Sequence, residues 1–163
     1  MTQKRRVKKV CRQLLEGGIT VSAAESFTGG GVSSQLVSRP GMSASFLLGI
    51  VAYTDNAKAA HLGVGTEILE RFGAVSPECA QAMAKGIREA SGSDIAVATT
   101  GFAGPGGGTP AAPVGTFFVA AVRGGAVCCR RFFVKGSRRR VTKHGVKEAF
   151  RIIEYMLKQN SDA

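Results

Sequence analysis

The order of its apolar segments constrains the fold of this chain more than any other feature of the sequence. Strand-like segments at 19–26, 45–53 and 94–101 alternate with segments of helical periodicity, and two more, at 114–123 and 126–134, flank Gly124-Gly125. Alternation with helices is typical of parallel strands joined by crossovers, whereas a Gly-Gly pair between two strands indicates an antiparallel hairpin. We therefore predict an α/β fold: a three-layer α/β/α sandwich with a mixed, mostly parallel sheet. The 45–53 segment reads as a buried strand.

Local signals set the expected helices and the domain organisation. Val7, Val10, Cys11 and Leu14 follow helical spacing, which predicts a helix over 4–16. Ser76-Pro77 indicates a helix start, because serine caps a helix and proline fits its first turn. The last helix should begin near Ser137. Because no repeat or linker interrupts the 163 residues, we expect a single domain over 1–163, with a frayed tail from about residue 159.

Composition limits the class of protein and its cofactors. No apolar run approaches the length of a membrane span, and the basic N-terminus lacks the apolar core of a signal peptide, so we expect a soluble cytoplasmic protein. The four cysteines show no C-x-x-C spacing, and neighbouring Cys128 and Cys129 should point to opposite faces of a strand. Reduced thiols without a metal are the interpretation that we favour.

The formal net charge of +11 comes largely from two basic clusters at the two ends of the chain. Such clusters indicate either a patch for nucleic acid or phosphorylated ligands, or two solvated basic helices. We favour the solvated helices, because aromatic residues are not interleaved with the charges. The clusters comprise Lys4, Arg5, Arg6, Lys8, Lys9 and Arg12, then Arg130, Arg131, Lys135, Arg138, Arg139, Arg140, Lys143 and Lys147.

Three motifs that could carry chemistry each follow a predicted strand. Ser26-Phe27-Thr28-Gly29-Gly30-Gly31 stands at a strand-to-helix turn, where backbone N–H groups could bind an anion or an oxyanion, or where Ser26 or Thr28 could merely cap the helix. The glycine-rich stretch 101–110 favours a phosphate or ribose nest over a plain surface loop.

The third motif contains Tyr53 and Lys58. A lysine can act as general base towards a serine, although a lone lysine on a helix surface is the common case. If the preceding strands are parallel, their carboxyl ends bring all three motifs to one rim of the sheet. This arrangement would suit an amidase for a phosphorylated substrate.

Four blocks together resemble the CinA C-terminal domain family: AESFTGG, VAYTDNAKAAHLGV, FGAVSPECAQAMAKG and TTGFAGPGGGTPAAPVGT. The resemblance covers about residues 14–157 and implies an α/β/α fold, no metal and no cofactor. It also implies hydrolysis of the carboxamide of nicotinamide mononucleotide to nicotinate mononucleotide and ammonia, in pyridine-nucleotide salvage. Full-length family members carry a further N-terminal domain, so the chain resembles a stand-alone member.

The resemblance assigns roles to individual residues. Ser26 matches the nucleophile, and Tyr53 and Lys58 match the residues that assist it. Substrate contacts are expected from Thr28, Gly29, Gly30, Thr100, Gly101, Gly104, Gly106, Gly107 and Arg138.

The chain departs from the family pattern at a few positions. Phe27 replaces a usual cysteine and should reshape the pocket wall. The other departures from the family pattern are Thr54-Asp55-Asn56 and Ser137. The alternatives are a non-catalytic nucleotide-binding protein and, from the charge and the competence label of the family, a protein that acts with nucleic acid. A homodimer is a further expectation.

Overall fold

The computed structural model describes residues 1–159, in which five strands form one sheet of order β2-β1-β3-β4-β5. The expected tail lies mostly in residues 160–163, outside this range. The strands are β1 (Val21–Glu25), β2 (Phe46–Val51), β3 (Ile95–Gly101), β4 (Thr116–Arg123) and β5 (Ala126–Phe133). The helices are α1 (Gln3–Glu16), α2 (Gly31–Val37), α3 (Asp55–Leu62), α4 (Thr66–Phe72), α5 (Pro77–Ser91) and α6 (Arg138–Lys158), with a short 3₁₀ turn at Met42–Ala44.

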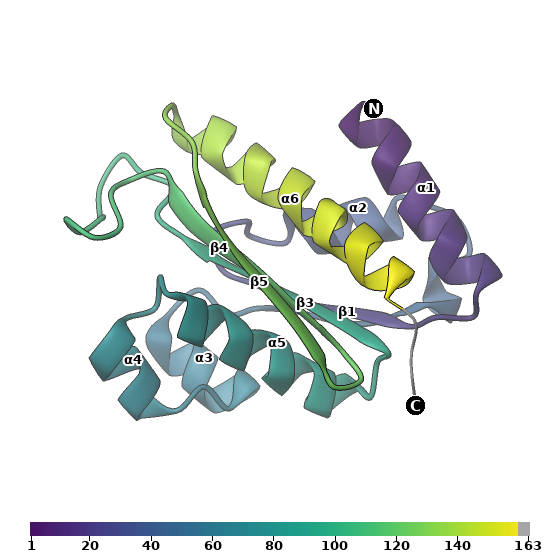
Figure 1. Ribbon diagram of the computed structural model, residues 1–163, viewed down its shortest axis with the longest axis horizontal. Helices are drawn as coiled ribbons and strands as arrows, with labels where there is room; N and C mark the ends of the chain where they lie inside the picture. Colours follow the sequence, from purple (N-terminus) through teal and green to yellow (C-terminus); the bar gives the residue numbers. More distant parts are fainter. Residues whose placement is uncertain (160–163) are drawn as a thin grey trace.

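The helices cover both faces of the sheet, which confirms the three-layer α/β/α arrangement. Helices α1, α2 and α6 lie on one face and α3, α4 and α5 on the other (Figure 1). Each face has its own apolar core: Phe117 and Phe150 belong to the first, and Met83 and Ile87 to the second. The central strands β1, β3 and β4 are buried on both sides, because a helix layer covers each of them above and below.

The expectation of a mostly parallel sheet was wrong. Strand β1 pairs in parallel with β2 and β3, but β3–β4 and β4–β5 are antiparallel ladders. The hairpin at Gly124-Gly125 does form, and β4 is the strand that runs the other way. Because β4 lies between β3 and β5 rather than at the edge, its reversal makes both of its ladders antiparallel.

The prediction of a buried strand at 45–53 was also wrong. Strand β2 is an edge strand that, within residues 1–159, pairs only with β1, and its residues alternate between half-buried and exposed. Leu47 and Val51 are consequently exposed. An apolar sequence does not distinguish an edge strand from a central one, since that difference depends on which distant strands pair.

Local helix signals were more reliable. Helix α5 begins at Pro77, and the Ser76 hydroxyl accepts a hydrogen bond from the Cys79 amide. Helix α6 begins just after Ser137, whose side chain caps it. Cys128 and Cys129 pack against opposite cores, as predicted for neighbours on a strand. Among the helices of residues 1–159, none is long and apolar enough to cross a membrane.

Candidate active site

The carboxyl ends of β1, β2 and β3 meet at one edge of the sheet, because these three strands run in the same direction. A cavity of about 240 Å³ opens there. It brings together eight of the residues that the sequence singled out: Ser26, Tyr53, Lys58, Thr100, Gly101, Gly104, Gly106 and Arg138. The other four, Thr28, Gly29, Gly30 and Gly107, do not line it.

Ser26 is the first residue after β1, the strand between β2 and β3. Its N–H donates to the carbonyl of Thr99 on β3 at 3.0 Å, which extends the ladder by one bond. The residue is 7% exposed, and its side chain lines the cavity. A serine at this place is held by the sheet yet open to a ligand on one side.

Glu25, which the sequence analysis did not single out, fixes the turn that follows Ser26. Its fully buried carboxylate accepts from the Thr28 hydroxyl at 2.7 Å and from the Gly30 and Val32 amides at 3.1 and 3.0 Å. It also accepts from the amide and the hydroxyl of Ser33, at 2.8 and 2.7 Å. The chain thus supplies its own anion to the N-terminus of α2, the place where carboxylates are stabilised. The sequence signal that could have identified Glu25 is its place, as an acidic residue, just before a glycine-rich helix start.

The expected anion site at the start of α2 is therefore already occupied. The Gly30 amide donates to Glu25, and the Gly29 amide donates to the Ser26 carbonyl at 3.0 Å. Thr28 turns its hydroxyl inward to Glu25 and Thr99. Within residues 1–159, the amides of Phe27 and Thr28 make no hydrogen bond. Phe27 lines the cavity and Thr28 does not, so the Phe27 amide is the donor of this turn that remains for an oxyanion.

Lys58 reaches the same cavity from α3. Its side chain is only 2% exposed, and its Nζ lies 3.4 Å from the carbonyl oxygen of Tyr53 and 3.8 Å from the Asp55 carboxylate. Asp55 also lines the cavity, where the sequence analysis noted it only as a departure from the family pattern. Helix α3 packs closely against α5 at Gly86, a residue of α5 that leaves no room for a side chain. A Cβ there would lie 1.8 Å from the carbonyl oxygen of Leu62, the last residue of α3.

Arg138, at the start of α6, joins two of the three predicted motifs. One of its guanidinium nitrogens donates to the Tyr53 hydroxyl at 2.6 Å, and the other donates to the Gly104 carbonyl at 2.9 Å. Tyr53 is 57% exposed at the rim of the cavity. In the same loop, the amides of Ala103, Gly104 and Gly106 make no hydrogen bond to another part of the described chain. The rim thus presents a cation and unpaired N–H groups, both of which favour an anionic ligand.

Phe27 and Thr100 form parts of the wall. Phe27 lines the cavity and packs against Phe117, with ring centroids 5.2 Å apart, and a Cβ on Gly145 would lie 2.3 Å from the Phe27 ring. Thr100 donates its hydroxyl to the Ala74 carbonyl at 2.6 Å. Phe27 is therefore held in one position by its neighbours, and Thr100 ties the wall to the segment before α5.

Cys79 is buried on α5, and its thiol differs chemically from the Ser26 hydroxyl. Burial raises the pKa of its thiol to about 11; the charge that Lys58 carries when protonated opposes this shift, and the Asp55 carboxylate adds to it. A thiol with such a pKa is protonated near neutral pH and is a weak nucleophile. In the described part of the chain, no three His, Cys, Asp or Glu side chains are grouped as a metal site would require.

Comparison with known proteins gives one consistent family. The model of the CinA C-terminal domain matches residues 3–157. A putative competence-damage inducible protein of Desulforudis audaxviator is 44% identical over 154 residues, which is 94% of this chain and 37% of that protein. One from Clostridium perfringens is 47% identical over 132 residues, 81% of this chain and 32% of that protein. The chain thus spans about a third of the length of these curated relatives.

Solved structures match over nearly the whole chain. The competence damage-inducible protein A from Klebsiella pneumoniae is 32% identical with a TM-score of 0.93, covering 98% of this chain and 100% of that one. The competence/damage inducible protein CihA from Agrobacterium tumefaciens is 36% identical with a TM-score of 0.92, covering 96% of each chain.

Proposed function

The chain belongs to the CinA C-terminal domain family, and we propose that it is a nicotinamide mononucleotide amidohydrolase with Ser26 as nucleophile. The observation that carries the proposal is that Ser26 and Lys58, both almost fully buried, line one cavity although they follow different strands. The products are nicotinate mononucleotide and ammonia.

In the proposed first step, Lys58 as neutral amine accepts the proton of the Ser26 hydroxyl while Oγ attacks the carboxamide carbon. The negative charge that develops on the amide oxygen is stabilised by the N–H group of Phe27, the cavity-lining residue beside Ser26 whose amide is unpaired. The carbon–nitrogen bond then breaks, and ammonia leaves with the proton returned by Lys58. Water hydrolyses the resulting ester and regenerates Ser26.

The contacts of Tyr53 favour a positioning role over proton transfer. Its hydroxyl is bonded to Arg138, whereas Lys58 approaches only its main-chain carbonyl. We therefore assign Tyr53 and Arg138 together to the nucleotide end of the substrate. Arg138 and the unpaired amides of the 101–108 loop would bind the 5′-phosphate there.

The test is release of ammonia from nicotinamide mononucleotide by the purified protein. Ser26→Ala should lower kcat by at least about 10³-fold, and Lys58→Met, which keeps the buried volume, by about 10²–10⁴-fold. Ser43→Ala and Lys85→Ala are matched controls, because both side chains are exposed away from the cavity. Circular dichroism would verify the fold of each variant.

Two results would reject the proposal in different ways. Equal activity in the wild type and Ser26→Ala would refute the nucleophile. Binding of the nucleotide without ammonia release in any variant would indicate a non-catalytic binding protein.

A further inference from the structure

Part of the second basic cluster, on α6, lines a groove between the N-terminus of α1 and the first turns of α6. The groove measures about 560 Å³ and shares no lining residue with the candidate active site. Four Lys or Arg side chains and one histidine line it, and no acidic residue does. Its lining comprises Met1, Thr2, Gln3, Ser137, Arg139, Arg140, Lys143, His144 and Lys147.

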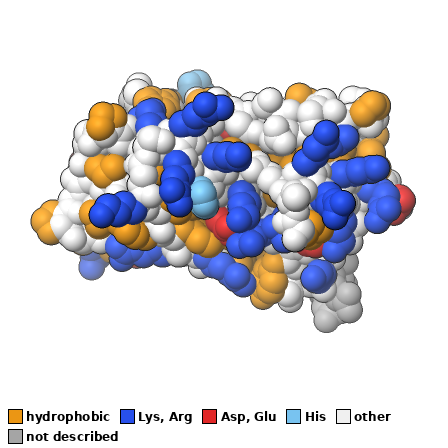
Figure 2. Space-filling view, turned by 90° about the horizontal axis from the view of Figure 1, so that it is seen from above, with side chains coloured by type: hydrophobic (Ala, Val, Ile, Leu, Met, Phe, Trp, Pro, Cys, Tyr) orange, Lys and Arg blue, Asp and Glu red, His pale blue; other side chains and the backbone are white. Residues whose placement is uncertain are grey.

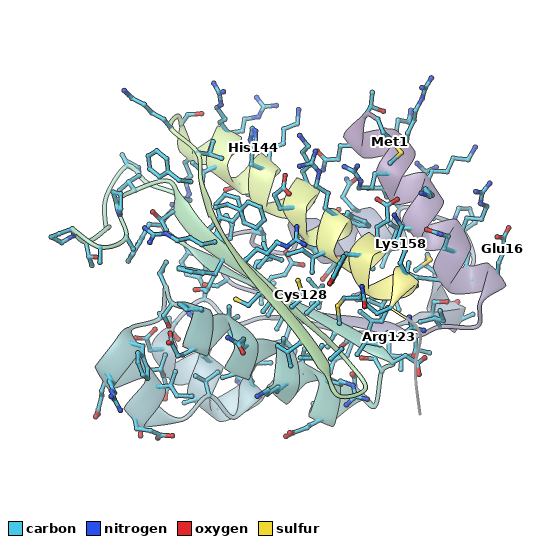
Figure 3. The ribbon with its side chains drawn as sticks, viewed as in Figure 1. Met1, Glu16, Arg123, Cys128, His144 and Lys158 are labelled. Carbon is cyan, nitrogen blue, oxygen red and sulfur yellow. The ribbon has the colours of Figure 1, made fainter. Side chains whose placement is uncertain are left out.

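The surface around the groove is strongly cationic. Figure 2, which looks down on the molecule from the side of α1 and α6 in Figure 1, shows Lys and Arg side chains spread over this face with few acidic ones. Figure 3 shows nitrogen-tipped side chains projecting outward around His144 and Met1. On α1, Lys4, Arg5 and Lys8 are exposed as well, so the charge continues from one helix to the other.

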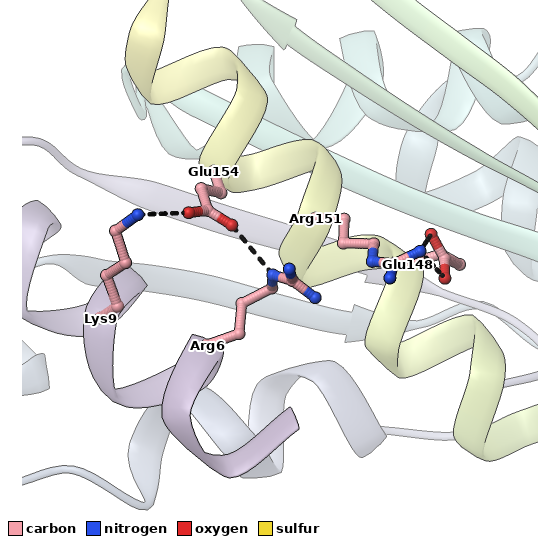
Figure 4. Close-up of polar contacts among 5 residues, drawn as sticks. All are labelled: Arg6, Lys9, Glu148, Arg151 and Glu154. Atoms are coloured by element: carbon pink, nitrogen blue, oxygen red, sulfur yellow. Dashed lines mark hydrogen bonds and ion pairs between the residues drawn. The ribbon is translucent and has the colours of Figure 1, made fainter. Parts of the chain in front are cut away.

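The acidic residues of these helices neutralise other cations. Glu154 accepts from Lys9 and Arg6 at 2.6 and 2.9 Å, and Glu148 accepts from Arg151 at 3.0 Å (Figure 4). None of the ion pairs found in residues 1–159 involves the four groove cations. Their charge is thus uncompensated by any ion pair within the described part of the chain.

The spacing of the cations fits a row of phosphates. Arg139, Lys143 and Lys147 stand four residues apart on one side of α6. Eight residues of helix rise span about 12 Å. One strand of a nucleic-acid duplex presents about three or four phosphates over that length of its axis. Among the described residues that line the groove there is no Phe, Tyr or Trp on which an unpaired base could stack, and His144 is the one ring-bearing side chain.

We propose that this groove binds the phosphodiester backbone of a nucleic-acid duplex, without reading its sequence. The row of cations without an ion-pair partner carries the affinity, and the lack of Phe, Tyr and Trp in the groove favours a duplex over a single strand. Arg138 adjoins this row in sequence but points to Tyr53 and Gly104, so the groove and the active site use different side chains.

The experiment is fluorescence anisotropy with a labelled 20-base-pair DNA duplex, the same duplex in RNA and the single DNA strand, between 50 and 200 mM salt. We expect both duplexes to bind more tightly than the single strand. With about four phosphates neutralised, the affinity should fall roughly 150-fold over this salt range.

Arg139→Gln/Lys143→Gln should remove about half of that salt dependence and weaken binding at 50 mM salt. The matched control is Arg71→Gln/Lys85→Gln, which removes the same charge from exposed positions on α4 and α5. Anisotropy measures duplex binding and needs no amidase activity, so this test is independent of the proposed amidase. Both double variants should release ammonia from nicotinamide mononucleotide at the rate of the wild type.

Three outcomes would overturn the proposal: no duplex binding at 50 mM salt, equal weakening by the two double variants, or tighter binding of the single strand. Polyglutamate that competes as well as an unlabelled duplex would also overturn it, because the groove would then bind acidic polymers in general.

Discussion

Replacing Glu25 by glutamine tests whether its carboxylate holds the turn that carries Ser26. Glutamine has nearly the same shape, but one carboxylate oxygen becomes an NH₂ group that can only donate. All five groups around Glu25 donate in the structure. The least costly orientation turns the NH₂ towards Ser33, whose hydroxyl can rotate to accept, while the Ser33 amide loses its acceptor.

The magnitude follows from these contacts. A buried amide without an acceptor costs about 1–3 kcal/mol, and the three remaining bonds lose the strengthening that a charged acceptor gives. Part of this loss is offset, because glutamine needs no burial of a charge. We expect Glu25→Gln to lower the free energy of unfolding by about 3 kcal/mol, which corresponds to a fall in Tm of about 6–12 °C in a domain of this size.

The assay is thermal unfolding followed by circular dichroism, with Glu148→Gln as the matched control. Glu148 is also buried, but among the residues that the structure describes it accepts only from Arg151, whose side chain is 48% exposed. Its replacement should cost less than about 1 kcal/mol. If the Tm of Glu25→Gln differs from that of Glu148→Gln by less than about 2 °C, the reasoning is refuted.

Three further predictions concern stability and reactivity. Hydrogen bonds, first from Lys9 and then from Arg6, lower the pKa of Glu154 although burial raises it, so Glu154→Gln should cost about 1–3 kcal/mol at neutral pH. A lowered pKa stabilises the fold only while the group is ionised. In urea melts below about pH 4.5, the difference in unfolding free energy between wild type and Glu154→Gln should therefore shrink. A difference that stays constant with pH would contradict this. Gly86→Ala should destabilise by at least about 2 kcal/mol in the same melts, because its Cβ has no space, whereas Gly125→Ala, with nothing within 4 Å, should be nearly neutral. Burial raises the pKa of Cys79 and of Cys129 to about 11, so mass spectrometry should find both labelled by a thiol reagent at pH 8 at least about 100-fold more slowly than in urea; equal rates would contradict the burial.

The sequence predicted best what depends on neighbouring residues. The start of α5 at Ser76-Pro77 and the hairpin at Gly124-Gly125 are local signals, and both elements lie where expected. The edge position of β2 could not be predicted, because it follows from pairing with β1 alone, across 20 or more residues of chain.

The candidate site shows the same limit. Ser26, Tyr53 and Gly101 were expected on one rim because each follows a strand, and all three line one cavity. Arg138 came only from the family resemblance, since its partners Tyr53 and Gly104 lie 85 and 34 residues away. Glu25 stands next to Ser26 in the sequence, yet its role appears only when α2 folds back over its carboxylate.

The edge position of β2 also gives the two halves of the proposed site different resistance to heat. Ser26 follows a central strand, whereas Tyr53 and Lys58 follow a strand with a single neighbour. Sheets open first where the fewest hydrogen bonds hold them, and such local opening costs less than global unfolding. Warming should therefore separate Lys58 from Ser26 while the centre of the sheet is still intact, and the proposed amidase activity should be lost reversibly several degrees below the melting temperature.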